Sequence, residues 1–80
     1  MKNFNINQTD FDSGFEAGVA KATQMEKATL KRLLYEFILD HTVLETLAIE
    51  EFKSNRLRKA DQASFIQGFV SGFVEQGTTD

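Results

Sequence analysis

The chain has 80 residues, a net charge of −3, and neither cysteine nor proline. A chain of this length forms a single domain, residues 1–80, that buries only about 60% of the surface of its unfolded state. Without cysteine it has no disulfide or thiolate metal site. We therefore expect self-association to stabilise the fold. The net charge argues against sequence-independent binding to nucleic acid. The first residues are polar, and the longest uncharged run has 13 residues, from Gln62 to Val74. These features predict a cytoplasmic protein with no membrane span.

Residues 1–8 are polar and rich in asparagine, which predicts an N-terminal tail that either frays or is anchored by Phe4 or Ile6 against the first helix. That helix is expected to begin at Thr9, whose hydroxyl can cap backbone N–H groups. Apolar residues then recur three and four positions apart. They are Phe11, Phe15, Val19, Ala22, Leu30, Leu33, Leu34, Phe37 and Ile38.

This spacing predicts one continuous helix from Thr9 to about residue 40. A break near Thr23 is the alternative, because Glu26 falls on the apolar side and residues 23–26 fit a capping box. The polar side of the same helix carries Lys31, Arg32 and Tyr35, which we expect to be solvated.

A second, short helix is expected from the capping box at Thr42 to a turn near residues 53–55. The last helix is expected to begin between Ser54 and Asp61 and to end at Gly77, a favourable C-terminal cap. Its apolar and small residues cover more than half of its circumference. We therefore expect a partner chain to bury part of this helix, since one layer of neighbours in so small a domain leaves some of it uncovered.

Both terminal helices carry the motif F-x-x-G-F-x-x-G followed by an apolar residue. Four glycines inside helices oppose folding by roughly 2–4 kcal/mol, so close helix packing must offset that cost, and we expect phenylalanine rings of one helix to lie over glycines of the other. Three interpretations stay open: packing of the two copies within one chain, a homodimer or higher oligomer interface, or a groove for a foreign protein. The residues concerned are Phe11, Gly14, Phe15, Gly18, Phe65, Gly68, Phe69, Gly72 and Phe73.

A basic cluster at the junction before the last helix offers a second candidate site, for phosphates of nucleic acid. No aromatic residue interleaves it and the helix that follows is apolar, so a solvated turn is the simpler interpretation. The cluster comprises Lys53, Arg56, Arg58 and Lys59. His41 has Asp40 and Glu45 nearby but lacks the further ligands that a metal site needs. No catalytic set stands out, so we expect neither enzyme activity nor a cofactor.

The two F-x-x-G-F-x-x-G helix openings, the polar start Met1 to Asn5, the small size and the charged, cysteine-free middle resemble small accessory proteins of tailed bacteriophages. Such proteins commonly bind a host protein, including host defence complexes, and inhibit or redirect it. The resemblance implies a partner-binding role and assigns no catalytic or binding residue.

Together these patterns predict an all-α bundle of three helices, or four if the first one breaks, whose terminal helices pack through their F-x-x-G-F-x-x-G faces. The expected function is a non-catalytic protein–protein interaction module, an inhibitor or adaptor of a host protein. The alternatives are a DNA-binding regulator that uses the cluster from Lys53 to Lys59, and a structural protein that forms homo-oligomers.

Overall fold

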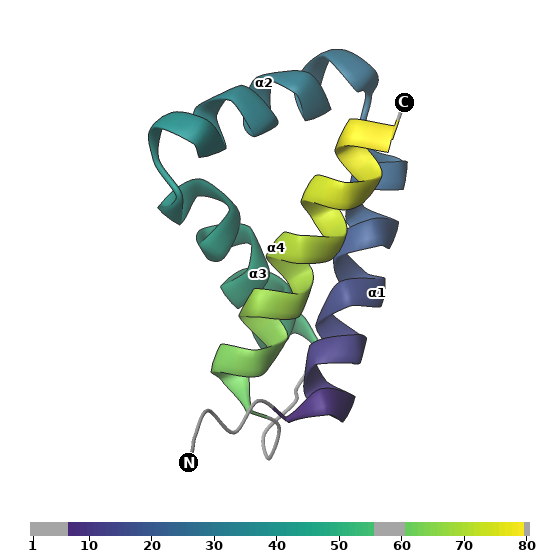
Figure 1. Ribbon diagram of the computed structural model, residues 1–80, viewed down its shortest axis with the longest axis vertical. Helices are drawn as coiled ribbons and strands as arrows, with labels where there is room; N and C mark the ends of the chain where they lie inside the picture. The colour runs from purple at the N-terminus through teal and green to yellow at the C-terminus, as the bar shows by residue number, and fades with distance from the viewer. Residues whose placement is uncertain (1–6, 56–60, 80) are drawn as a thin grey trace.

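The computed structural model describes residues 7–55 and 61–79, and these two ranges are entirely helical apart from short connections (Figure 1). The helices are α1 (Gln8–Gln24), α2 (Lys27–Leu39), α3 (Thr42–Ser54) and α4 (Gln62–Thr79). The described residues contain no strand, which confirms the predicted all-α class. No helix among them combines the length and the hydropathy needed to cross a bilayer.

The terminal helices α1 and α4 lie side by side and run in the same direction, although residues 25–61 separate them in the sequence (Figure 1). A parallel pair requires a long return connection, and α2 and α3 provide it. Helix α2 crosses the end where α1 and α4 finish, and α3 leads back along α4 (Figure 1). The molecule is therefore a helix pair closed on one side by a two-helix connection.

The core lies between α4, α3 and the facing side of α1. Three phenylalanines one turn apart on α4, namely Phe65, Phe69 and Phe73, are fully buried, and their rings stack with centroids 6.4 and 6.1 Å apart. Phe52 of α3 adds an edge-on contact to Phe65 at 5.4 Å. Leu44 and Ala48 of α3 are buried against the same cluster.

Part of α4 was expected to be buried by a partner chain, but its three phenylalanines are buried within this chain. The side of α4 that carries Gly68 and Gly72 is covered by α1, and the phenylalanine side is covered by α3. The glycines bring α1 so near that α1 and α3 together bury these two sides of α4, while Ile66 and Val70 stay half-buried.

The predicted continuous first helix is also wrong, because the chain turns at Met25 and Glu26. Both residues are extended, with ψ of 151° and 145° respectively. The alternative, a break near Thr23 that gives four helices, is the arrangement in the structure, although Thr23 itself still belongs to α1, where its hydroxyl donates to the Val19 carbonyl. Breaking the helix here leaves Glu26 exposed rather than on the apolar side.

Three predicted helix ends differ from the structure. Helix α1 begins before Thr9, because the side chain of Asn7 accepts the Asp10 N–H and acts as the N-cap, so residues 7 and 8 do not belong to a tail. At the start of α3 the carboxylate of Asp40, rather than the Thr42 hydroxyl, is the acceptor. The other predicted tail residues, including Phe4 and Ile6, lie outside the described residues.

Helix α4 continues through Gly77 to Thr79 instead of ending at the glycine. A Cβ at Gly77 would lie 2.7 Å from the Leu34 Cδ1 of α2. Gly77 therefore lets α2 pack against the end of α4, and this contact explains why a glycine stands there without ending the helix.

Candidate functional site

The seam between α1 and α4 brings the two copies of the repeated motif together. Gly14 and Gly18 of α1 and Gly68 and Gly72 of α4 are all buried. A Cβ built on Gly14 would overlap the carbonyl oxygen of Phe65 and lie 2.9 Å from the Phe69 nitrogen. The carbonyl oxygen thus occupies the space of the missing side chain, which is the geometry of Cα–H···O contacts between closely packed helices.

The contacts across this seam are reciprocal. Gly14 meets the backbone of Phe65, and its counterpart Gly68 meets the backbone of Phe11. In the next turn Gly18 meets Phe69 and Gly72 meets Phe15 in the same way. The nearest atoms are main-chain atoms of the phenylalanines, so the expectation that their rings lie over the glycines is wrong. The structure uses these glycines for packing within one chain, on a local twofold axis parallel to the helices.

The two helices also cap each other where they begin. The Asp10 carboxylate of α1 accepts the backbone N–H of Asp61, the residue before α4, at 2.6 Å. The Ser64 hydroxyl of α4 accepts the backbone N–H of Asn7, the residue before α1, at 3.0 Å. In an ordinary capping box the third helical residue caps its own helix. Here each third residue caps the neighbouring helix, so the two starts are joined.

This exchanged cap is a feature that the sequence interpretation missed, although the repeat contains a signal for it. The two copies are separated by 54 positions, from Phe11 to Phe65, and the same offset relates Asn7 to Asp61 and Asp10 to Ser64. The repeat therefore begins four residues before its first phenylalanine. Asparagine and aspartate are both strong N-caps, so the pattern was readable as two matched helix starts.

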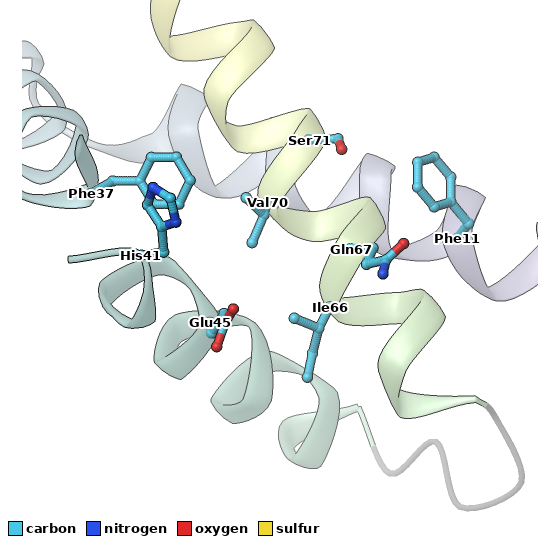
Figure 2. A pocket seen from close by; sticks show the side chains of 8 residues that line it. All are labelled: Phe11, Phe37, His41, Glu45, Ile66, Gln67, Val70 and Ser71. Atoms are coloured by element: carbon cyan, nitrogen blue, oxygen red, sulfur yellow. The ribbon is translucent and has the colours of Figure 1, made fainter. Parts of the chain in front are cut away.

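A groove opens between α4 on one side and the junction of α2 with α3 on the other (Figure 2). Its volume is about 300 Å³. Four apolar and four polar side chains from all four helices line it. They are Phe11, Phe37, His41, Glu45, Ile66, Gln67, Val70 and Ser71. Figure 2 shows Val70 and Ile66 on the α4 wall, with Glu45 on the α3 wall opposite them.

One end of the groove is formed by two stacked rings. The rings of Phe37 and His41 lie with their centroids 4.8 Å apart and tilted by 32° (Figure 2). Glu45 follows one turn later on α3, yet no group of three or more His, Cys, Asp or Glu side chains among residues 7–55 and 61–79 has the arrangement of a metal site. The groove is suited to holding apolar and hydrogen-bonding groups of a ligand.

The carboxylate of Asp40 fixes the turn behind His41. It accepts the Thr42 hydroxyl at 2.7 Å and the Thr42 backbone N–H at 3.0 Å. These hydrogen bonds to Thr42, with a smaller contribution from the charge of His41, lower the pKa of Asp40 below its ordinary value of 3.8. The ionised form is therefore favoured, and it caps the start of α3 beside His41.

Large apolar side chains are exposed together on the second half of α2. Tyr35 is 65% exposed, and Ile38 and Leu39 are each 71% exposed. The sequence interpretation placed Ile38 on the buried stripe. The break at Met25 and Glu26 gives α2 its own axis, on which Leu30 faces inward and Ile38 does not.

The predicted basic cluster is described only in part. Lys53 lies exposed in the last turn of α3. Arg56, Arg58 and Lys59 lie outside the described residues. Phosphate binding by the cluster therefore remains a prediction.

Comparison with known proteins finds no matching family model, no matching characterised protein and no matching solved structure. The fold and the groove are thus the observations from which a function is argued.

Proposed function

We propose that this protein is a non-catalytic protein–protein interaction module and that the groove beside α4 receives apolar side chains of a foreign protein. The observation that carries the proposal is the groove itself, which is open and about 300 Å³ in volume. Apolar walls with a few hydrogen-bonding groups are typical of binding sites.

The size and lining of the groove suit a short helical or extended segment of a partner. Ile66 and Val70 are half-buried, so a partner side chain placed between them and Phe37 would remove further apolar surface from water. Gln67 and Ser71 are exposed on the same wall and offer hydrogen bonds at the rim. An apolar centre with a polar rim is the usual composition of a protein–protein interface.

The resemblance to accessory proteins of tailed bacteriophages supports a bacterial host protein as the partner, with inhibition or redirection of that protein as the effect. It rests on the two F-x-x-G-F-x-x-G copies. Those copies build the seam between α1 and α4, and the seam holds Phe11 and α4 in the positions that line the groove.

The experiment compares two exposed serines that receive the same substitution. Ser71→Arg places a long charged side chain at the groove, whereas Ser13→Arg places it on α1 away from the groove. Tagged wild-type protein and both variants are used to capture proteins from bacterial lysate, and each captured protein is purified and its affinity measured by calorimetry. We expect Ser71→Arg to weaken binding at least tenfold and Ser13→Arg to leave it unchanged. Equal binding by both variants, or no protein retained by the wild type, would contradict the proposal.

A further inference from the structure

Helix α2 has apolar side chains on two opposite faces. The inward face contributes Leu30, Leu33, Leu34 and Phe37 to the core. The outward face carries Tyr35, Ile38 and Leu39, each with about two thirds or more of its surface exposed. A helix on the edge of a monomeric domain normally has polar residues on its outer face, so a second apolar face indicates a contact outside the domain.

The outward face continues toward the start of α2 with basic residues. Lys31 and Arg32 precede Tyr35 by four and three positions, which places them on the same side of the helix. Both are exposed. The outward face thus changes along the helix from basic to apolar.

The flank of this face changes from basic to acidic. Arg32 and Glu36 lie one turn apart on this side of α2, and Asp40, the extended C-cap of the helix, comes four residues after Glu36. When two copies of such a helix pack antiparallel about a twofold axis, this flank of one helix lies beside the same flank of the other, and the two run in opposite directions. Arg32 of each copy then lies beside the acidic end of the other, and the charge pattern is complementary to itself.

We propose that the outward face of α2 binds a second copy of this chain, forming a twofold symmetric dimer with antiparallel α2 helices. Tyr35, Ile38 and Leu39 of the two copies pack together at its centre. Figure 1 shows α2 along one outer edge of the molecule, with α1, α3 and α4 on its other side.

The size of the contact sets its strength. A 13-residue helix is roughly 20 Å long, and one pair of such helices buries less than the 800 Å² or so per partner of a standard interface. The dimer is therefore concentration-dependent. Light scattering on the full chain should give a mass near 9.1 kDa when dilute and a rise toward twice that value as concentration increases into the millimolar range.

Single cysteines test the geometry, because the chain contains none of its own. Near the twofold axis, a cysteine at Ile38 lies beside its counterpart in the second copy. A cysteine at Ala28, an exposed position of the same helix, lies nine residues from the axis and about 27 Å from its counterpart, far beyond the limit of about 7 Å for a disulfide. We expect Ile38→Cys to form a covalent dimer under mild oxidation and Ala28→Cys to remain monomeric.

Each other outcome overturns the proposal. Cross-linking of both variants would mean a parallel or unspecific contact, and cross-linking of neither would mean that no such dimer forms. Ile38→Asp should abolish the rise in mass, with Ala20→Asp on exposed α1 as the matched control. This dimer is independent of the foreign partner proposed above, since Ser71→Arg alters the groove and leaves the outward face of α2 intact.

Discussion

The glycines of each terminal helix lie against carbonyl oxygens of the other helix, so the addition of a single methyl group tests this close packing. In Gly68→Ala the new Cβ would overlap the Phe11 carbonyl oxygen and lie 2.9 Å from the Phe15 nitrogen. Backbone atoms move only when the whole helix moves. We expect the free energy of unfolding to fall by about 1–3 kcal/mol, despite the gain in helix propensity, as measured by urea unfolding.

Gly77→Ala is the matched control for this change. Its Cβ would meet the Leu34 Cδ1, the end of a flexible side chain that can change rotamer. The free energy of unfolding should therefore change by less than about 1 kcal/mol. If Gly68→Ala were as mild as Gly77→Ala, the close backbone approach between α1 and α4 would be refuted.

Asp40 gives the fold an acid-sensitive contact. Its pKa is lower in the folded state than in the unfolded chain, chiefly because of the two hydrogen bonds from Thr42. The stabilisation is therefore complete above the unfolded value and is lost as the pH falls through the folded value. We expect Thr42→Val, which removes the hydroxyl donor, to raise the pKa of the Asp40 carboxyl toward 3.8 in an NMR titration.

Thermal unfolding at different pH values tests whether the contact between Asp40 and Thr42 contributes to stability. Asp40→Asn has no charge to lose, so its melting temperature should fall less steeply than that of the wild type below about pH 4. Parallel curves for the two proteins would show that this carboxylate does not contribute to the acid sensitivity.

Residue by residue, the sequence predicted which glycines matter and misjudged what they touch. Two glycines four apart on a helix define a face without side chains, and that face is visible in the spacing alone. Whether a ring or a carbonyl oxygen fills it depends on how the second helix is placed. The direction of α4 relative to α1 depends on the return path through α2 and α3, which spacing does not reveal.

At the scale of the helix, the exchanged cap should make the starts of α1 and α4 depend on each other. Ser64 is 3% exposed, and its hydroxyl accepts the Asn7 N–H and donates to the Asp61 carboxylate. Removing this hydroxyl leaves the Asn7 N–H without its acceptor. We expect Ser64→Ala to lower the free energy of unfolding by about 1–3 kcal/mol in urea.

Ser71→Ala supplies the comparison, because it is the same change in the same helix at an exposed position. Its effect should lie within about 0.5 kcal/mol of zero. A double-mutant cycle of Ser64→Ala with Asp10→Asn should in addition show a coupling energy, since both side chains join the same two helix starts. Additive effects would mean that the two caps act separately.

Helix boundaries were predicted less well than helix existence. The return to a helix after Asp40 was predicted because an apolar run follows it directly, and α3 ends near Ser54 as its polar residues indicate. The break at Met25 and Glu26 contains neither proline nor glycine. Its local signals are the capping-box pattern of residues 23–26 and the position of Glu26, and the apolar spacing that continues past them favoured the unbroken helix instead.

At the scale of the whole molecule, stability should be unevenly distributed. Helix α4 has six fully buried residues, whereas α2 has one, Leu30. A helix with so little burial opens without unfolding the rest. We expect α2 amides to exchange with solvent at least tenfold faster than those of the central turns of α4, measured by hydrogen exchange on dilute protein.

The same experiment at high concentration separates local opening from self-association. A dimer through α2 would slow exchange in α2 and leave α4 unchanged. If α2 and α4 exchanged at the same rate in dilute protein, the fold would open as one unit.

The groove could not have been predicted from the sequence, because its lining comes from all four helices and residues from 11 to 71. His41 was recognised as a singular residue, and Phe37 as part of an apolar stripe. Their stacking at one end of a groove follows from the turn at Asp40, which places the end of α2 over the start of α3.

The twofold relation between α1 and α4 is broken at the positions that receive α3. Helix α4 has Ile66 and Val70 beside α3, and the same offset places Asp12 and Glu16 at the corresponding positions of α1. Both acidic side chains are exposed. Apolar residues at those two positions would let α1 bind the α3 of another molecule. Because such a contact joins two different surfaces, it could repeat from molecule to molecule and form an open chain. Asp12 and Glu16 keep the outer side of α1 polar at the two places where α4 is apolar.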